Sequence, residues 1–449
     1  MSDWNDAESR VEKAQELFEQ HRWNEALEEL RAAISINPYN SGWFFNIGLT
    51  LDEMERFDEA IDAYRKALEI EPDDLQAMQH LGLDLHRLRN FPEALRTFER
   101  MEAIDSSCEA SYCHRIMVYA DTGEHDRAEE MFYLARLYKE HCPHCYYNMG
   151  CSLRDRRLFD KAIYCWQKTL DLDEAYPQVQ IRIAEALWGK GELESARQHF
   201  LTGLRQDPGN MQTVLDLGEL LTEMGRWEEA GEKFRRAIEL APEQPAGYFC
   251  YGCWLARIGQ EDDAIASLTR ALSLDPTFPG AHLRLAELYH ARQELSLTRK
   301  HSRAELMLRP QEPTVLLDLS NLLFDTAQER AAIACLKRLT QIEPDSVQGW
   351  QNLSVAQFTA GRHDEGISSG REALRLEPRN LAVLFNLALA CERHGRFDRA
   401  AAWIRRGLEV DPVDISLQRL RARVRFMQWR QRLAAAARHL IGRPSRRQA

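Results

Sequence analysis

Large apolar residues recur along the chain at spacings of three or four positions, which is the periodicity of one face of an α-helix. In residues 41–74 and 211–244 they are Phe44, Ile47, Leu51 and Tyr64, and then Val214, Leu217, Leu221 and Phe234. A strand would alternate apolar and polar residues with a period of two. The pattern therefore predicts amphipathic helices and gives no sign of a sheet.

Small residues and prolines repeat with a fixed period of 34 residues. Counted from Ala7, the eighth residue of each unit is small in eleven of twelve units, and the twentieth is alanine in ten. Small side chains at these positions let two antiparallel helices approach closely. Proline stands at position 32 in nine units and stops the second helix. Glycine at position 15 is expected to end the first helix in six units: Gly123, Gly191, Gly225, Gly259, Gly361 and Gly395.

With these positions in register, the chain resembles the tetratricopeptide repeat family over about nine-tenths of its length. The resemblance implies an all-α fold, a right-handed superhelical solenoid of tandem helix-turn-helix repeats with a concave inner face. We expect a leader at residues 1–6, twelve repeats at 7–414, a capping helix at 415–440 and a basic disordered tail at 441–449. Because each repeat packs mainly on its neighbours, one elongated domain without a separate linker is expected.

The family places positions 2, 5, 6, 9, 12 and 13 of each unit on the concave face. Position 6 is asparagine in four units, and an asparagine amide offers both a donor and an acceptor to the backbone of a bound peptide. The ladder is interrupted by other polar residues, which favours a short or selective site over a continuous clamp. Apolar residues at position 5 offer side-chain pockets, or else they pack between adjacent first helices. The expected partner-binding residues are Phe45, Asn46, Leu49, His80, His114, Tyr147, Asn148, Arg182, Asp216, Phe249, Arg284, Asp318, Asn352, Phe385 and Asn386.

Charge and composition narrow the class of function. The formal net charge of −12 argues against general nucleic-acid binding. The N-terminus lacks a secretory pattern, and no apolar run is long enough for a membrane span. Ten cysteines in this context predict reduced thiols and a cytoplasmic protein. The repeats leave no room for a catalytic domain, so we expect no enzyme activity and no cofactor.

A group of cysteines and histidines lies in units 3 to 5. It includes Cys142-Pro143-His144-Cys145, whose spacing occurs in zinc knuckles and redox pairs, with Cys108 and Cys113 nearby. A single such motif is a weak signal, and no bound metal is predicted. Three interpretations remain open: structural cysteines, a metal site and a redox pair.

The C-terminal segment is strongly basic. From Ile415 onward it contains ten arginines and no acidic residue. Either these arginines are simply exposed to water on a capping helix, or they contact an acidic partner, an anionic lipid surface or RNA.

The leading hypothesis is a protein-protein interaction scaffold or adaptor that binds protein or peptide segments in the concave groove. One alternative is an assembly factor or chaperone for an apolar client, associated with a membrane through the arginine-rich end. Another is a metal- or redox-sensing regulator that uses the cysteine and histidine group.

Two units depart from the pattern. Unit 9 has Thr298, Ser302 and Glu305 where the second helix should be small or apolar, and unit 11 has Gly366 and Gly370 in its second helix. Glycine lowers helix stability by roughly 0.8–1.0 kcal/mol relative to alanine. We therefore expect residues 293–372 to be the least stable part of the repeats.

Overall fold

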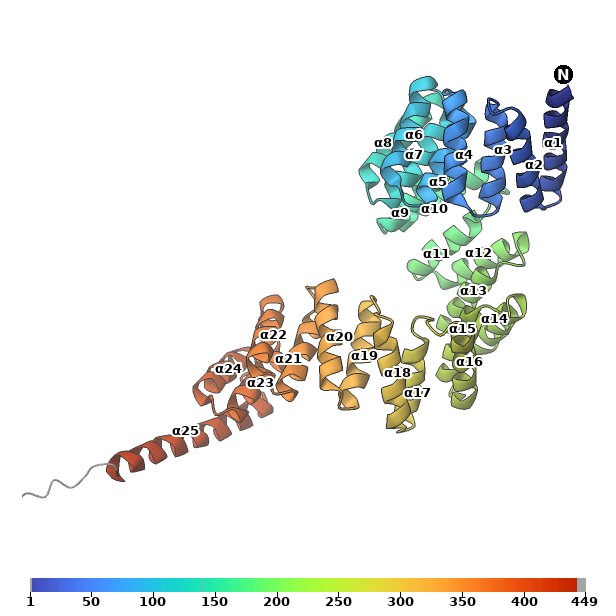
Figure 1. Ribbon diagram of the computed structural model, residues 1–449. Coiled ribbons are helices and arrows are strands. Elements are labelled where there is room, and N and C mark those ends of the chain that lie inside the picture. The colour runs from blue at the N-terminus through green and yellow to red at the C-terminus, as the bar shows by residue number, and fades with distance from the viewer. Residues whose placement is uncertain (1, 140, 442–449) are drawn as a thin grey trace, which may run out of the picture. The chain divides into compact units, whose positions relative to one another are not determined.

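The computed structural model describes residues 2–139 and 141–441, and all regular elements in them are α-helices (Figure 1). The fold is therefore an all-α array of tandem helix pairs. The chain divides into two compact units, residues 1–226 and 227–449, which are described separately. Residues 442–449 of the predicted basic tail lie outside the described residues.

The first unit contains thirteen described helices, in which odd numbers are the first helices of repeats and even numbers are the second. Their bounds are α1 (Ser2–Glu19), α2 (Trp23–Ile36), α3 (Ser41–Glu53), α4 (Phe57–Ile70), α5 (Leu75–Arg87), α6 (Phe91–Ile104), α7 (Glu109–Asp121), α8 (His125–Tyr138), α9 (Pro143–Asp155), α10 (Phe159–Leu172), α11 (Val179–Gly189), α12 (Leu193–Gln206) and α13 (Met211–Glu223). Each second helix packs on the first helix of its own repeat and on that of the next repeat.

The second unit continues the alternation and ends with a longer helix. Its described helices are α14 (Trp227–Leu240), α15 (Pro245–Arg257), α16 (Glu261–Leu274), α17 (Ala281–Ala291), α18 (Leu295–Met307), α19 (Pro313–Asp325), α20 (Glu329–Ile342), α21 (Val347–Thr359), α22 (His363–Leu376), α23 (Leu381–Arg393), α24 (Phe397–Val410) and α25 (Ile415–Ile441). The last of these packs on α24 and α23.

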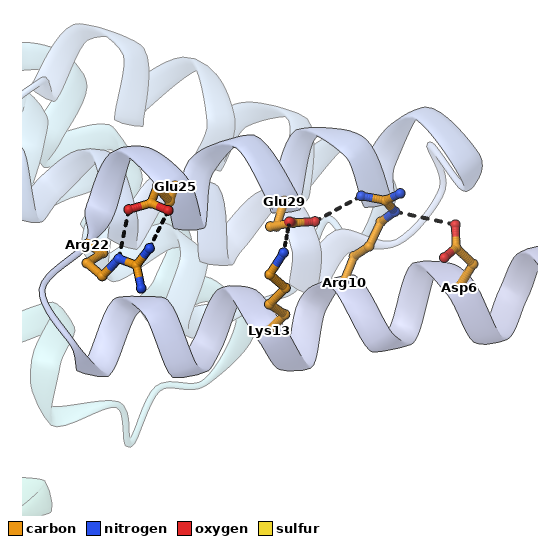
Figure 2. A network of polar contacts seen from close by, with 6 residues as sticks. All are labelled: Asp6, Arg10, Lys13, Arg22, Glu25 and Glu29. Carbon is orange, nitrogen blue, oxygen red and sulfur yellow. Dashed lines mark hydrogen bonds and ion pairs between the residues drawn. The ribbon is translucent and has the colours of Figure 1, made fainter.

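The N-terminal helix begins earlier than the repeat pattern indicates. Helix α1 starts at Ser2, so residues 2–6, which were expected to form a leader, belong to its first turns. An ion pair four residues apart, Asp6 with Arg10, supports this turn. Figure 2 shows how Arg10 and Lys13 of α1 also reach Glu29 of α2, at 2.9 and 2.5 Å. Lys13 is exposed, and Arg10 and Glu29 are half-buried, so we expect these pairs to set the register of α1 on α2 more than they add stability.

Position 15 of every repeat adopts a left-handed backbone conformation. The six glycines predicted to end first helices have φ between 68° and 82°. In the other six repeats φ lies between 56° and 62°, at His21, Glu55, Arg89, Arg157, Gln293 and Ala327. The prediction for the glycines is thus confirmed, but the geometry of the repeat imposes this turn on other residue types as well, at a higher conformational cost.

In three repeats a glycine at position 8 faces a large ring at position 24 of the same repeat. A Cβ atom built on Gly48 would lie 2.3 Å from the ring of Tyr64. The corresponding distances are 2.4 Å from Gly82 to the ring of Phe98 and 2.4 Å from Gly150 to the ring of Trp166. Since carbon atoms do not approach so closely, these glycines make the room that the rings fill.

The polar residues of unit 9 have partners that the sequence pattern did not indicate. Glu305 of α18 is buried, and its two carboxylate oxygens accept hydrogen bonds from the backbone N–H groups of Gly280 and Leu283 at 3.0 and 3.1 Å. These donors lie at the start of α17, whose own N-terminal residue provides no side-chain cap. Glu305 therefore caps the first helix of its own repeat.

The glycines of unit 11 also have a packing role. A Cβ atom at Gly366 would lie 2.6 Å from the ring of Phe358, and one at Gly370 would lie 2.8 Å from Leu387. The lower helix propensity of these glycines is therefore offset by close packing with α21 and α23. The expectation that residues 293–372 are the least stable segment stays a prediction.

Candidate functional site

Each first helix has one side that faces the second helix and another that does not. In α3, Gly48 and Leu51 at positions 8 and 11 are buried, whereas Asn46 at position 6 is half-buried. Because an α-helix has about 3.6 residues per turn, positions 2, 6, 9 and 13 lie opposite positions 8 and 11. In each compact unit, we call this side of the first helices the first-helix face. Fourteen of the fifteen predicted partner-binding residues are half-buried, and Arg284 is exposed.

An aromatic cluster lies where α3 and α5 meet on the first-helix face. The ring of Phe45 is 5.5 Å from the imidazole of His80, and the ring of Tyr64 lies 5.8 Å from Phe45 and 5.6 Å from His80. Two predicted residues, Phe45 and His80, are thus in contact across adjacent repeats. The edge-to-face contact holds both rings in fixed orientations, so part of the surface of each ring is buried against the other and is not available to a ligand.

Two carboxylates share one arginine beside this cluster. The guanidinium of Arg87 donates to Asp52 at 2.9 Å and to Asp84 at 2.8 Å, and the hydroxyl of Tyr64 donates to Asp52 at 2.9 Å. Asp84 is fully buried, and its second oxygen has no hydrogen-bond partner when both carboxylates are ionised. Burial and the adjacent Asp52 raise the pKa of Asp84 to about 8. Burial also disfavours ionisation of Asp52, but hydrogen bonds from His80, Asp84 and Tyr64 outweigh it and hold its pKa below the usual value.

We expect the Asp84→Asn variant to change the pH dependence of stability in the first unit. A carboxyl group with a raised pKa in the folded state stabilises the fold at low pH, and this contribution is lost as the pH rises towards about 8. The asparagine cannot ionise, and its amide can still donate to Asp52. At about pH 9 the variant should therefore be more stable than the wild type, by about 1–3 kcal/mol, because it removes a poorly solvated charge.

Hydrogen exchange of the α5 amides at about pH 5 and about pH 9 measures this difference. Asp58→Asn on α4 is the matched control, because Asp58 is exposed. Equal pH dependence in the wild type and the Asp84→Asn variant would show that Asp84 is ionised throughout.

His114 and Asn148 lie on the first-helix face of the next two repeats, but their side chains contact other residues of the protein. The His114 imidazole lies 5.1 Å from the ring of Phe98, and its buried Nε2 has no hydrogen-bond partner. Burial, with the nearby imidazoles of His144, His86 and His80, lowers the pKa of His114 to about 4. The amide of Asn148 donates to the carbonyl oxygen of Cys113 at 2.7 Å and so ties α9 to α7.

Tyr147, Arg182 and Asp216 form a polar row towards the end of the first unit. The ring of Tyr147 lies 5.1 Å from that of Tyr176, while Arg182 pairs with Glu185 at 3.0 Å. Asp216 accepts a hydrogen bond from Gln212 at 2.8 Å. Burial raises the pKa of Asp216 to about 6. Charges of both signs therefore alternate along this part of the face.

In the second unit the predicted residues are spread over five first helices. Phe249 of α15 lies 5.2 Å from the ring of Phe278, and Arg284 of α17 pairs with Glu287 at 2.8 Å. Partial burial lowers the pKa of Arg284, but Glu287 and, more weakly, the carboxylate of Asp318 raise it, and the net result lies above the usual value. Phe385 packs partly against the core near α25.

Three asparagine amides on this face have no hydrogen-bond partner among the described residues. In the described part of the chain, the side-chain amides of Asn46, Asn352 and Asn386 make no hydrogen bond, unlike that of Asn148. All three are half-buried, so their amides lie at the surface beside packed neighbours. The four asparagines at position 6 are thus of two kinds, and three of them keep both donor and acceptor for a ligand.

The cysteine and histidine group offers no metal site among the described residues, because no three side chains of the ligating types converge there. The Cys142 thiol accepts a hydrogen bond from the backbone N–H of Cys145 at 3.0 Å, and both side chains are buried. Hydrogen bonds with Cys113 and Cys142, together with burial, raise the pKa of the Cys145 thiol far above its usual value. A thiol held in its neutral form is a poor nucleophile, which favours a structural role.

Comparison with protein families decides the class of the repeats. Models described as tetratricopeptide repeat match residues 43–74, 147–211, 182–245, 317–378 and 357–424. These matches together cover more than half of the chain. The chain belongs to the tetratricopeptide repeat family.

Three solved tetratricopeptide-like structures are similar to this chain at low identity. Yeast Tom70 is 15% identical with a TM-score of 0.40, over 95% of this chain and 96% of that one. YrrB, described as a TPR protein with an unusual peptide-binding site, is 16% identical with a TM-score of 0.39, over 42% of this chain and 97% of that one. A chain of the Cut9–Hcn1 hetero-tetramer of the APC/C is 16% identical with a TM-score of 0.38, over 92% and 95%. A search of curated proteins found no match.

The tetratricopeptide repeat pattern located the first-helix face but missed several residues that shape it. Asp52 occupies position 12, one of the positions that the family assigns to the concave face, so reading acidic residues at that position would have found it. Asp84 at position 10 and Tyr176 in the turn before α11 carry no such signal. Their roles depend on contacts between elements. Asp84 shares Arg87 of its own helix with Asp52 of the preceding repeat. Tyr176 contacts Tyr147 and His144 at the start of its own repeat.

Proposed function

We propose that this tetratricopeptide repeat protein is a non-catalytic scaffold that binds extended segments of protein partners on the first-helix face of each of its two compact units. The observation that carries the proposal is the set of three half-buried asparagine amides, Asn46, Asn352 and Asn386, without partners in the described chain. Polar groups that are partly withdrawn from water favour a ligand that completes their hydrogen bonds.

The amides would recognise the backbone of the bound segment. Each asparagine side chain can donate to a peptide carbonyl and accept from a peptide N–H, whatever the side chain of the ligand. Asn46 and Asn386 each follow a half-buried phenylalanine, Phe45 and Phe385, whose accessible part would contact an apolar side chain of the segment. This combination suits an extended peptide that alternates backbone contacts with side-chain contacts.

The charged residues of the face would add selectivity rather than affinity. Arg182 and Arg284 already pair with Glu185 and Glu287 of their own helices. A ligand must therefore compete with an internal partner for each arginine, which reduces the net gain from a new ion pair. Discrimination between segments of different charge is the expected result.

The distribution of apolar surface favours a selective peptide site over a site for a broadly apolar client. On the first-helix face, the predicted apolar residues Phe45, Leu49, Phe249 and Phe385 are half-buried. The large apolar side chains that are about half exposed or more include Tyr133 and Leu137 on α8 and several on α25. A surface that holds apolar clients would need a contiguous exposed patch. The first-helix face instead offers polar groups beside half-covered rings.

The proposal is tested by capturing partners from a lysate of the source cells with the full chain. The face variant carries Asn46→Ala, Asn352→Ala and Asn386→Ala. We expect it to lose the partners that the wild type captures, because each lost pair of amide hydrogen bonds weakens binding by about 0.5–1.5 kcal/mol. Mass spectrometry of the captured proteins gives the readout.

The matched control carries Gln198→Ala and Gln341→Ala, two exposed amides on the second helices α12 and α20. It should keep the partners of the wild type. Asn148→Ala is kept separate, because this amide ties α9 to α7 and its loss changes the fold locally. Identical partner sets for the wild type and the face variant would move the binding site away from the first-helix face.

A further inference from the structure

The final helix has an inner side that covers the last repeat. Leu417, Leu420 and Val424 of α25 are buried against α23 and α24, and Met427 adds a partly buried contact. Gln428 donates to Asp398 of α24 at 2.8 Å, and Arg423 pairs with Glu392 of α23 at 2.8 Å. Helix α25 extends beyond these contacts (Figure 1). The inner side thus accounts for the capping of the repeats.

The outer side of α25 carries a second apolar stripe that nothing in the described chain covers. Phe426, Trp429 and Leu433 are 55%, 56% and 49% exposed, and their spacings of three and four residues put them on one line. Ile415 and Ala422 continue this line towards the start of the helix, and both are exposed. The line lies opposite Leu420 and Val424, because the helix turns by about 100° per residue. The rings of Phe426 and Trp429 stack with centroids 6.0 Å apart.

Arginines border this outer stripe on both sides. Helical periodicity puts Arg419, Arg423 and Arg430 along one edge, and Arg421, Arg425 and Arg432 along the other. All six are exposed, and within the described residues only Arg423 has an ion-pair partner. The sequence from Ile415 onward contains no acidic residue that could neutralise them.

We propose that the outer side of α25 docks on the surface of an anionic lipid bilayer, with the helix lying in the plane of the interface. The surface of an anionic bilayer has a layer of charged headgroups and, beneath it, a layer of apolar acyl chains. The two rows of arginines suit the first layer, and the aromatic stripe suits the second. The stripe would enter the boundary between headgroups and acyl chains, while the arginines contact the lipid phosphates. This inference is independent of the first-helix face and of the proposed function.

Two arguments favour a bilayer surface over a second copy of the chain and over an RNA or an acidic protein. A second copy of the chain would bring another row of unpaired arginines against the first, which is repulsive. An RNA or an acidic protein would use the arginines but would leave the line from Ile415 to Leu433 in water. No described helix is long and apolar enough to cross a membrane, so α25 would lie on the bilayer without spanning it.

Vesicle co-sedimentation of the full chain tests the proposal. The vesicles contain phosphatidylcholine alone or with about 30 mol% phosphatidylserine, which sets the negative surface potential. The wild type should sediment with the anionic vesicles only, and less so as salt is raised. Replacing Arg419, Arg425, Arg430 and Arg432 by glutamine should lower the partition coefficient on the order of 1000-fold, at about 1 kcal/mol for each arginine.

A stripe variant separates lipid insertion from simple charge attraction. It carries Phe426→Ser, Trp429→Ser and Leu433→Ser, and we expect it to bind anionic vesicles at least about tenfold more weakly than the wild type. The matched control carries Tyr133→Ser, Leu137→Ser and Tyr138→Ser on α8, which are comparably exposed but lie beside Arg136 and Glu130 and not between two rows of arginines. The control should bind as the wild type does. Circular dichroism confirms that all variants keep their helix content.

Several results would overturn the proposal. If the wild type does not bind anionic vesicles, the proposal is wrong. If the stripe variant binds them as well as the wild type does, the aromatic stripe does not insert and the binding is non-specific charge attraction. A dimer in analytical ultracentrifugation that the stripe variant converts to monomer would identify a second copy as the occupant. Binding to RNA by both the wild type and the stripe variant, without binding to vesicles, would assign the arginines to nucleic acid.

Discussion

The Trp166→Ala variant is expected to lose about 3–5 kcal/mol of stability in the repeat that contains α9 and α10. The side chain of Trp166 is fully buried, and its indole N–H donates to the carbonyl oxygen of Tyr147 at 3.2 Å. Truncation leaves a cavity between the two helices and removes the partner of a carbonyl group. Since each repeat is stabilised mainly by its neighbours, the loss should also weaken the packing of α11.

The close contact between Gly150 and Trp166 gives this prediction an internal check. A Cβ atom on Gly150 would lie 2.4 Å from the indole, so Gly150→Ala alone should destabilise the repeat by about 1–3 kcal/mol. In the Trp166→Ala background the new methyl group enters the cavity instead, and the loss should shrink or vanish. The coupling between the two changes is expected at about 0.5–3 kcal/mol.

Hydrogen exchange of the α9 and α10 amides measures these local free energies, because long repeat arrays do not always unfold in one step. Tyr164→Ala on the same helix is the control. Its ring is 57% exposed, and its loss should change stability by less than about 0.5 kcal/mol. Equal effects of Gly150→Ala in both backgrounds would contradict the packing argument.

The Glu305→Ala variant should destabilise unit 9 by about 2–4 kcal/mol, since it leaves two buried backbone donors without an acceptor. These are the N–H groups of Gly280 and Leu283 at the start of α17. Glutamine at this position keeps only one acceptor oxygen, so Glu305→Gln should cause about half of the loss. The order wild type, glutamine, alanine is the signature of a cap.

Exchange of the α17 amides measures the effect of the Glu305 variants. Glu312→Ala removes a carboxylate that is exposed, and it should leave α17 unchanged. If the α17 amides exchange as slowly in the Glu305→Ala variant as in the wild type, the Glu305 carboxylate does not cap α17.

The parts of the fold that depend on one repeat alone were predictable from the sequence. Helical spacing, the small residue at position 8 and the turn at position 15 follow from steric rules that act within about 34 residues. The glycine turns, such as that at Gly123, and the packing of Gly48 on Tyr64 are examples. The same rules could not foresee the turn at Arg89 or Arg157, because non-glycine residues adopt it only under the constraint of the packed repeat.

Features that depend on the contact between two elements could not be predicted. Asn148 looks identical to Asn46 in the repeat pattern, yet only its amide reaches the carbonyl oxygen of Cys113 on the preceding first helix. Glu305 looks like a misplaced charge until the start of α17 is placed beside it. In both cases the deciding quantity is an interhelical distance of a few ångströms, and position in a repeat does not determine it.

The carboxylate pair formed by Asp52 and Asp84 has a consequence for calorimetry. With the pKa of Asp84 raised to about 8, the folded chain retains a proton near neutral pH that the unfolded chain releases to the solvent. The heat of unfolding then includes the heat with which the buffer takes up that proton. Enthalpies measured in phosphate and in Tris will therefore differ, although the protein and its contacts are the same.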